Sequence, residues 1–137
     1  MKRTLIAIIF ALLTTAGTAL AHHSFGAEFD KDRPVTLKGT LTKMEWVNPH
    51  GWIYIDVKGA DGTVVNWAIE TGSPTGLLRR GLRRDDFPIG VEVVVDGFLA
   101  KNGRSVANGR EVKFADGRNF FLGTSLGGAA GAEPSTR

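Results

Sequence analysis

The sequence predicts an all-β fold, a small OB-like β-barrel of five to six strands with one short helix, preceded by a signal peptide. Apolar and polar residues alternate in several short segments of residues 35–122, and turn residues recur every 8 to 12 positions. The one helical signal falls between the third and fourth predicted strands, which is the element order of an OB-fold. A sandwich with a similar number of strands is the alternative, because alternation does not reveal which strands pair.

Residues 1–21 have the form of a secretory signal peptide. A basic start at Met1-Lys2-Arg3 precedes an apolar run over Leu5–Leu13 and a small-residue cleavage site at Ala19-Leu20-Ala21. The apolar run is too short to cross a hydrocarbon core, which takes about 20 residues. We therefore expect a periplasmic or secreted protein with no permanent membrane span.

The net charge and the cysteine content of the sequence exclude some partners and some kinds of site. Removing Lys2 and Arg3 with the leader lowers the formal net charge from +3 to +1. Domains that bind nucleic acid usually have a pI above about 9 and a basic face, so we expect no nucleic-acid partner. The sequence has no cysteine, which excludes disulfides, thiol chemistry and cysteine-based zinc sites.

The first strand follows an N-terminal arm. Residues 22–34 show no sustained period, which predicts an extended arm held by Phe25 and Phe29. Apolar residues then alternate over Val35–Leu41, as in a half-buried strand. The apolar set shifts phase after this segment, which predicts a β-bulge near Thr42-Lys43.

A turn, a hairpin signal and a helix signal organise the middle of the chain. A turn at Asn48–Gly51 leads into a strand over Ile53–Val57, and a hairpin signal at Gly59–Gly62 leads into a strand over Val65–Ile69. The helix follows over Ser73–Gly81, with a serine cap, a proline at its first position and a glycine at its end.

The last third of the domain is again predicted to be strands, over Val91–Leu99, Val106–Phe114 and Phe120–Leu122. A hairpin signal at Lys101–Gly103 joins the first two, and the second is interrupted around Asn108-Gly109. The barrel domain thus extends over residues 35–122, and the Gly- and Ala-rich residues 123–137 are predicted to form a disordered tail.

Several segments together resemble a known family. They are His22-His23-Ser24-Phe25, Val35–Thr40, Glu45–His50 and Asp116-Gly117-Arg118. The chain resembles a family of small exported bacterial proteins of unknown function, which begin with HHSF and carry a W-x-N-P-H segment. The resemblance extends over about His22 to Leu122. It implies a periplasmic OB-like domain and brings no assigned activity or catalytic residues.

The three histidines predict a metal site. Cleavage after Ala21 leaves His22 with both an α-amino nitrogen and an imidazole, and His50 on its proline-stiffened turn offers another nitrogen. His23 or a carboxylate such as Glu70 completes the set, with Glu28 and Glu45 as other choices. Such nitrogen-rich sites suit divalent transition metals, copper above all. The structural alternative is a frayed terminus and a turn histidine bonded to the backbone.

The aromatic residues support a different function. Trp46, Trp52 and Tyr54 are predicted to form a stacking face, with Asn48 and Glu70 as polar neighbours in a ligand site. In the alternative, these rings are covered by the arm or close one end of the barrel.

The remaining motifs give little evidence of function. The basic run Arg79–Arg84 suits an anionic partner, but a solvated run at a helix C-terminus explains it as well. Motifs for nucleophilic catalysis are absent, so an enzyme is not favoured.

The predicted function is a periplasmic binding or accessory domain for a divalent metal, copper first. The alternative is a metal-free module for an envelope polymer, lipid, protein or small ligand. The sequence does not specify an oligomeric state.

Overall fold

A computed structural model describes residues 25–123, so the predicted signal peptide, His22, His23 and all but one residue of the predicted tail lie outside the described part. The elements in chain order are α2 (Phe25–Glu28), β1 (Phe29–Glu45), β2 (Trp52–Lys58), β3 (Val64–Glu70), α3 (Pro74–Arg79), the 3-10 turn η1 (Arg84–Asp86), β4 (Glu92–Ala100), β5 (Val106–Phe114) and β6 (Asn119–Phe121). No helix within residues 25–123 is long and apolar enough to cross a membrane.

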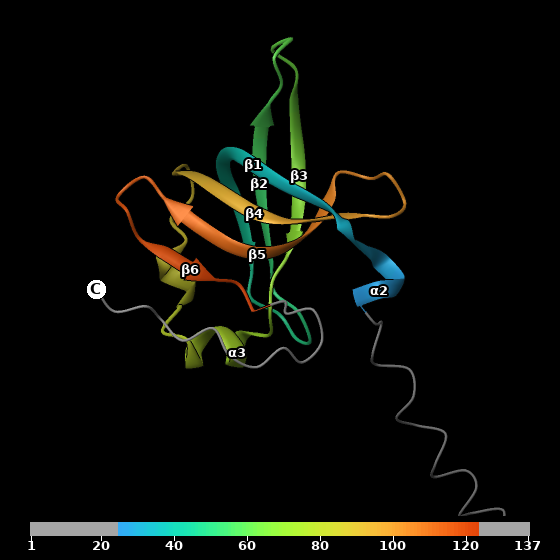
Figure 1. Cartoon of the computed structure of the whole chain (residues 1–137). Coiled ribbons are helices and arrows are strands. Elements are labelled where there is room, and N and C mark those ends of the chain that lie inside the picture. The colour runs from blue at the N-terminus through green and yellow to red at the C-terminus, as the bar shows by residue number, and fades with distance from the viewer. Residues whose placement is uncertain (1–24, 124–137) are drawn as a thin grey trace, which may run out of the picture.

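The strands form one sheet that closes into a barrel-like ring (Figure 1). Its order is β3-β2-β1-β4-β5-β6, and all of these neighbours are antiparallel. The ring closes where β3 and β5 pair in parallel. This pairing, with α3 between β3 and β4, is the OB arrangement, so the predicted OB-like β-barrel is confirmed and the sandwich alternative is wrong.

β1 is long and bent because it pairs with two strands. Its first part pairs with β4 and its last part with β2, and a register shift between Leu41 and Lys43 confirms the predicted bulge. At Gly39 the backbones of β1 and β2 approach so closely that a Cβ would lie 2.5 Å from the Asp56 carbonyl oxygen. A glycine is therefore required where the strand bends.

The N-terminal arm differs from its prediction. Residues 25–28 form one helical turn instead of an extended segment, and β1 begins at Phe29, before the predicted start at Val35. The Phe25 ring packs against Phe98 of β4 with 5.7 Å between ring centroids, and Phe29 is buried. Aromatic packing against β4 thus draws this part of the arm into the barrel.

The core lies inside the ring. The alternating inward side chains of the strands are buried together with residues from α3 and the segments around it. The buried core cluster consists of Leu37, Leu41, Met44, Ile53, Ile55, Ile69, Leu77, Leu82, Phe87, Val93, Val95, Ala107, Val112, Phe114 and Leu122.

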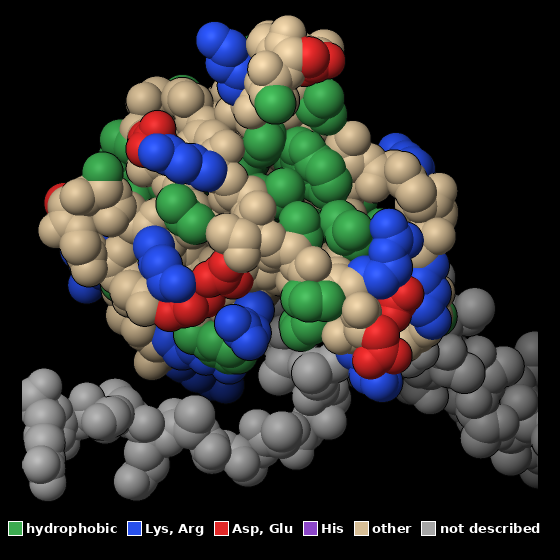
Figure 2. All heavy atoms as spheres, turned by 45° about the horizontal axis from the view of Figure 1, so that its top comes forward, with side chains coloured by type: hydrophobic (Ala, Val, Ile, Leu, Met, Phe, Trp, Pro, Cys, Tyr) green, Lys and Arg blue, Asp and Glu red, His purple; other side chains and the backbone are tan. Residues whose placement is uncertain are grey.

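The β2–β3 hairpin projects beyond the ring (Figure 1). Val64 and Val65 near its tip are exposed, whereas Val57 and Trp67, nearer the barrel, are partly buried against the core. Figure 2 shows apolar side chains gathered between the hairpin and the charged rim of the barrel. Apolar side chains are therefore exposed on the face from which the hairpin projects.

α3 forms as its sequence predicts. The Ser73 hydroxyl accepts a hydrogen bond from the Gly76 N–H, and Pro74 occupies the first turn. At the other end Gly81 has a φ of 82°, and the Leu82 N–H donates to the Leu77 carbonyl. This is a Schellman cap. Leu77 and Leu82 are both fully buried, so the caps hold α3 against the barrel.

The close contact between β4 and β5 predicts a glycine requirement. A Cβ at Gly97 would lie 2.3 Å from the Asn108 carbonyl oxygen, a backbone atom that moves only with its strand. We expect Gly97→Ala to lower the free energy of unfolding by about 1–3 kcal/mol, measured by urea denaturation. Gly26→Ala is the control, because no atom lies within 4 Å of its Cβ position. Equal stability of the two variants would contradict the close contact.

Candidate functional site

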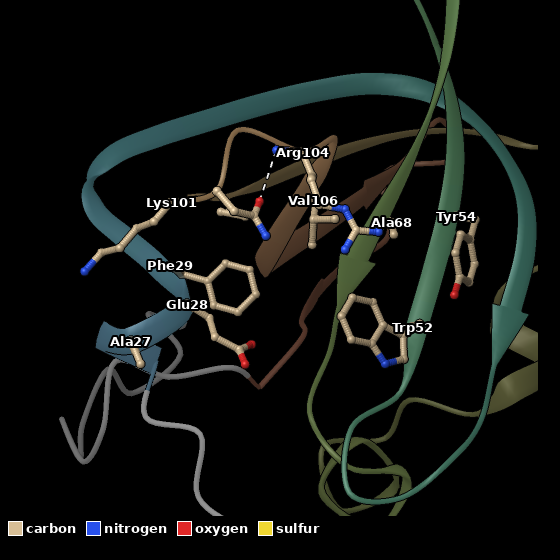
Figure 3. A pocket seen from close by; sticks show the side chains of 11 residues that line it. Ala27, Glu28, Phe29, Trp52, Tyr54, Ala68, Lys101, Arg104 and Val106 are labelled. Atoms are coloured by element: carbon tan, nitrogen blue, oxygen red, sulfur yellow. Dashed lines mark hydrogen bonds between the residues drawn. The ribbon is translucent and has the colours of Figure 1, made fainter.

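A groove of about 560 Å³ lies on the outer face of β2 and β3, which form one side of it, while α2 and the hairpin that joins β4 to β5 form the other side (Figure 3). Its lining combines aromatic rings, small apolar side chains and charged groups. The lining residues are Ala27, Glu28, Phe29, Trp52, Tyr54, Ala68, Ala100, Lys101, Asn102, Arg104 and Val106. OB-folds bind oligosaccharides and oligonucleotides on this same face.

Strand alternation places the aromatic rings. Ile53 and Ile55 are fully buried, so Trp52 and Tyr54 point outward from β2 and stay half-buried. Ala68 lies opposite Tyr54 on β3, and Val106 lies opposite Ala68 on β5. These two smaller side chains leave room beside the rings, which gives the groove its floor.

The β4–β5 hairpin is fixed against α2. The Lys101 N–H donates to the Glu28 carbonyl at 2.9 Å, and Lys101 Nζ donates to the Gly26 carbonyl at 2.6 Å. The hairpin turns at Gly103, whose φ is 75°, and the next N–H, of Arg104, donates to Asn102 Oδ1. The hairpin is therefore held in place beside the groove.

Arg104 is the charged group that this hairpin presents. Its side chain lines the groove and extends from the hairpin toward β3 (Figure 3). Within residues 25–123 its guanidinium makes neither an ion pair nor a hydrogen bond, whereas Arg118, for comparison, is bound by Asp86 and Asp116. The five N–H donors of Arg104 are thus available to a ligand.

Tyr54 is held by a network on the other side of β2. Its hydroxyl donates to Glu45 Oε2 at 2.9 Å, and Lys43 pairs with the other Glu45 oxygen. Lys43 and then Tyr54 hold the pKa of Glu45 below its ordinary value, while burial and then Glu45 raise the pKa of Tyr54. Because the hydroxyl is already engaged, Tyr54 contributes its ring to the groove lining.

A corner next to Trp52 contains His50. The turn between β1 and β2 is tied to the end of β3, since the Gly51 N–H donates to the Gly72 carbonyl and the Thr71 N–H donates to the Gly51 carbonyl. His50 Nδ1 contacts Glu70 Oε1, with the His50 side chain 46% exposed and that of Glu70 only 9%. Glu70 is the residue directly opposite Trp52 in the β2–β3 ladder.

The structure separates the residues predicted as ligand-binding. It brings Trp52 and Tyr54 into the groove and sets Glu70 beside Trp52. Trp46 is partly buried and packs against the core, and Asn48 is exposed on the turn without lining the groove.

The metal site predicted at His22, His23 and His50 is described only in part. His50 contacts Glu70, whereas His22 and His23 lie outside the described residues. Within residues 25–123 no three His, Cys, Asp or Glu side chains come together as a metal site.

Sequence reasoning did not find Lys101, Arg104 or Phe29 as groove residues. The Lys101-Asn102-Gly103 signal correctly predicted a turn. Strand pairing decides that this turn lies beside the outer face of β2 and β3. The alternation of apolar and polar residues does not encode that pairing.

The model of a family of unknown function, DUF6152, matches residues 11–109. The chain belongs to this family. The DUF6152 match extends from within the predicted leader to Gly109 of β5, so it includes both sides of the groove and agrees with the resemblance seen in the sequence. No curated protein and no solved structure matches the chain. Membership in DUF6152 therefore assigns no activity.

The Lys43–Glu45–Tyr54 network predicts a measurable shift in titration. Lys43→Met and Tyr54→Phe should each raise the pKa of Glu45, because each removes a group that favours the ionised carboxylate. The stability gained from this network is present above the ordinary glutamate pKa of about 4.3 and is lost as the pH falls through the lower folded value. NMR titration of the Glu45 carboxyl carbon measures both shifts. Lys113→Met, which removes a partner of Asp96, is the control. An unchanged Glu45 midpoint in both variants would rule the network out.

Proposed function

We propose that this chain is an exported binding domain of the bacterial envelope that holds a short stretch of acidic polysaccharide in its groove. One observation carries the proposal: an aromatic ring, Trp52, and the guanidinium of Arg104 line the same groove on the face that OB-folds use for ligands. The predicted signal peptide supports a location outside the cytoplasm.

The shape and lining of the groove suit a sugar chain. A volume of about 560 Å³ lies within the range of about 300–1,000 Å³ that is typical of small-ligand sites. The flat face of a pyranose packs against an indole ring, and Trp52 and Tyr54 both stand outward on β2. Ala68 and Val106 between the rings and the hairpin leave space for the sugar.

The charges favour an acidic sugar over a neutral one. Arg104 can bind a carboxylate with two parallel hydrogen bonds, which adds both energy and orientation. Lys101 also lines the groove, and although its ammonium group donates to the Gly26 carbonyl and points away from the groove (Figure 3), its charge adds to the positive potential nearby. Glu28 also lines it, and its carboxylate disfavours a ligand with closely spaced phosphates but accepts hydrogen bonds from sugar hydroxyls.

Calorimetry with defined oligosaccharides tests this function. We expect saturable binding of tetragalacturonate and binding of neutral cellotetraose that is at least about tenfold weaker. Trp52→Ala and Arg104→Gln should each weaken tetragalacturonate binding by at least about tenfold, equivalent to about 1.4 kcal/mol. Circular dichroism verifies that each variant is folded.

Arg33→Gln is the matched control, because Arg33 is an exposed arginine of β1 that does not line the groove. It should bind tetragalacturonate as the unmodified chain does. An equal loss in Arg33→Gln and Arg104→Gln would mean that binding follows overall charge. That result, or no saturable binding of tetragalacturonate, would overturn the proposed function.

A further inference from the structure

We propose that His50, Glu70 and Asn108 form a binding site for one divalent transition-metal ion. The three side chains come from three segments: the turn between β1 and β2, the end of β3, and β5. His50 Nδ1 already contacts Glu70 Oε1, and Glu70 and Asn108 lie directly opposite each other in the parallel β3–β5 ladder.

The contact between His50 and Glu70 joins two donor types that bind metals. Glu70 is almost wholly buried, so its carboxylate needs a positively charged or hydrogen-bonding partner. The imidazole of His50 is half exposed, which leaves a path for an ion to reach the pair.

Asn108 supplies an independent observation. Its side chain is buried, at 3% exposure, and its Oδ1 has no hydrogen-bond partner. Buried polar atoms without a partner are rare in native structures. Directly opposite residues of adjacent parallel strands point to the same face, and such strands lie about 4.8 Å apart. The Asn108 amide therefore stands on the face of the sheet that carries Glu70, where a bound cation would satisfy its oxygen.

The donor set indicates the class of ion. One imidazole nitrogen, one carboxylate oxygen and one amide oxygen suit borderline cations such as Zn²⁺, Ni²⁺ or Cu²⁺. Three protein ligands leave a coordination position for water or a further donor. Because the third donor is an amide, the site does not contain three His, Cys, Asp or Glu side chains. It therefore agrees with the absence of any such group of three within residues 25–123.

This site differs from the metal site predicted from the sequence. It shares His50 with that prediction but needs neither His22 nor His23, which lie outside the described residues. It is therefore independent of where the leader is cleaved. It is also separate from the polysaccharide groove, because His50, Glu70 and Asn108 do not line that groove.

Titration of the full-length, metal-free chain with Zn²⁺ and with Cu²⁺ tests the proposal. Calorimetry should show saturable binding of one ion per chain for at least one of the two metals. Cu²⁺ should also quench tryptophan fluorescence, since Trp52 lies opposite Glu70. We expect His50→Ala and Asn108→Leu each to weaken binding at least tenfold while both variants stay folded by circular dichroism.

Two further variants separate the alternatives. The double variant His22→Ala, His23→Ala should bind metal within about threefold of the unmodified chain, and Arg104→Gln should bind metal normally whether or not it loses the oligosaccharide. A loss in the double variant as large as that in His50→Ala would overturn the proposal in favour of an N-terminal site. The absence of saturable binding of either metal would overturn it as well.

Discussion

The parallel pairing of β3 with β5 is the constraint on which the rest of this structure depends. It closes the ring through three residue pairs at the end of β3, supported by the Ala68 N–H that donates to the Ser105 carbonyl. The same pairing sets Ala68 beside Val106, which forms the groove floor, and Glu70 beside Asn108. Barrel closure and both proposed binding sites therefore have a common origin.

A glycine on the inner side, Gly109, makes this closure possible. A Cβ at Gly109 would lie 2.7 Å from Leu122 Cδ1 and 2.9 Å from Ile69 Cγ2. The absence of a side chain there lets the end of β3, the middle of β5 and the segment after β6 pack together. The polar Asn108 and Glu70 alternate with Gly109 and Ile69 along their strands and face the other way. Core packing on one side thus fixes polar groups on the other.

Local signals predicted much of the fold but only part of the candidate site. Ser73, Gly81 and the bulge after Leu41 act within a few residues, so sequence alone placed them correctly. Alternation placed Trp52 outward for the same reason. Trp46 was included in the stacking face, yet the bulge puts it in phase with the buried Met44, and it packs against the core. The approach of Arg104 to the same groove as Trp52 depends on pairing between distant strands, which no local pattern encodes.

Amide hydrogen exchange at Ala68 tests the closure of the barrel most directly. This N–H lies at the point where β3 meets β5 and donates to Ser105 across the closure. The account predicts that it exchanges as slowly as the amides of the central β1–β4 ladder, because it opens only with the barrel. Exchange at the rate of a solvent-exposed strand edge would mean that β3 and β5 are not paired. The shared support for the groove and the proposed metal site would then be absent.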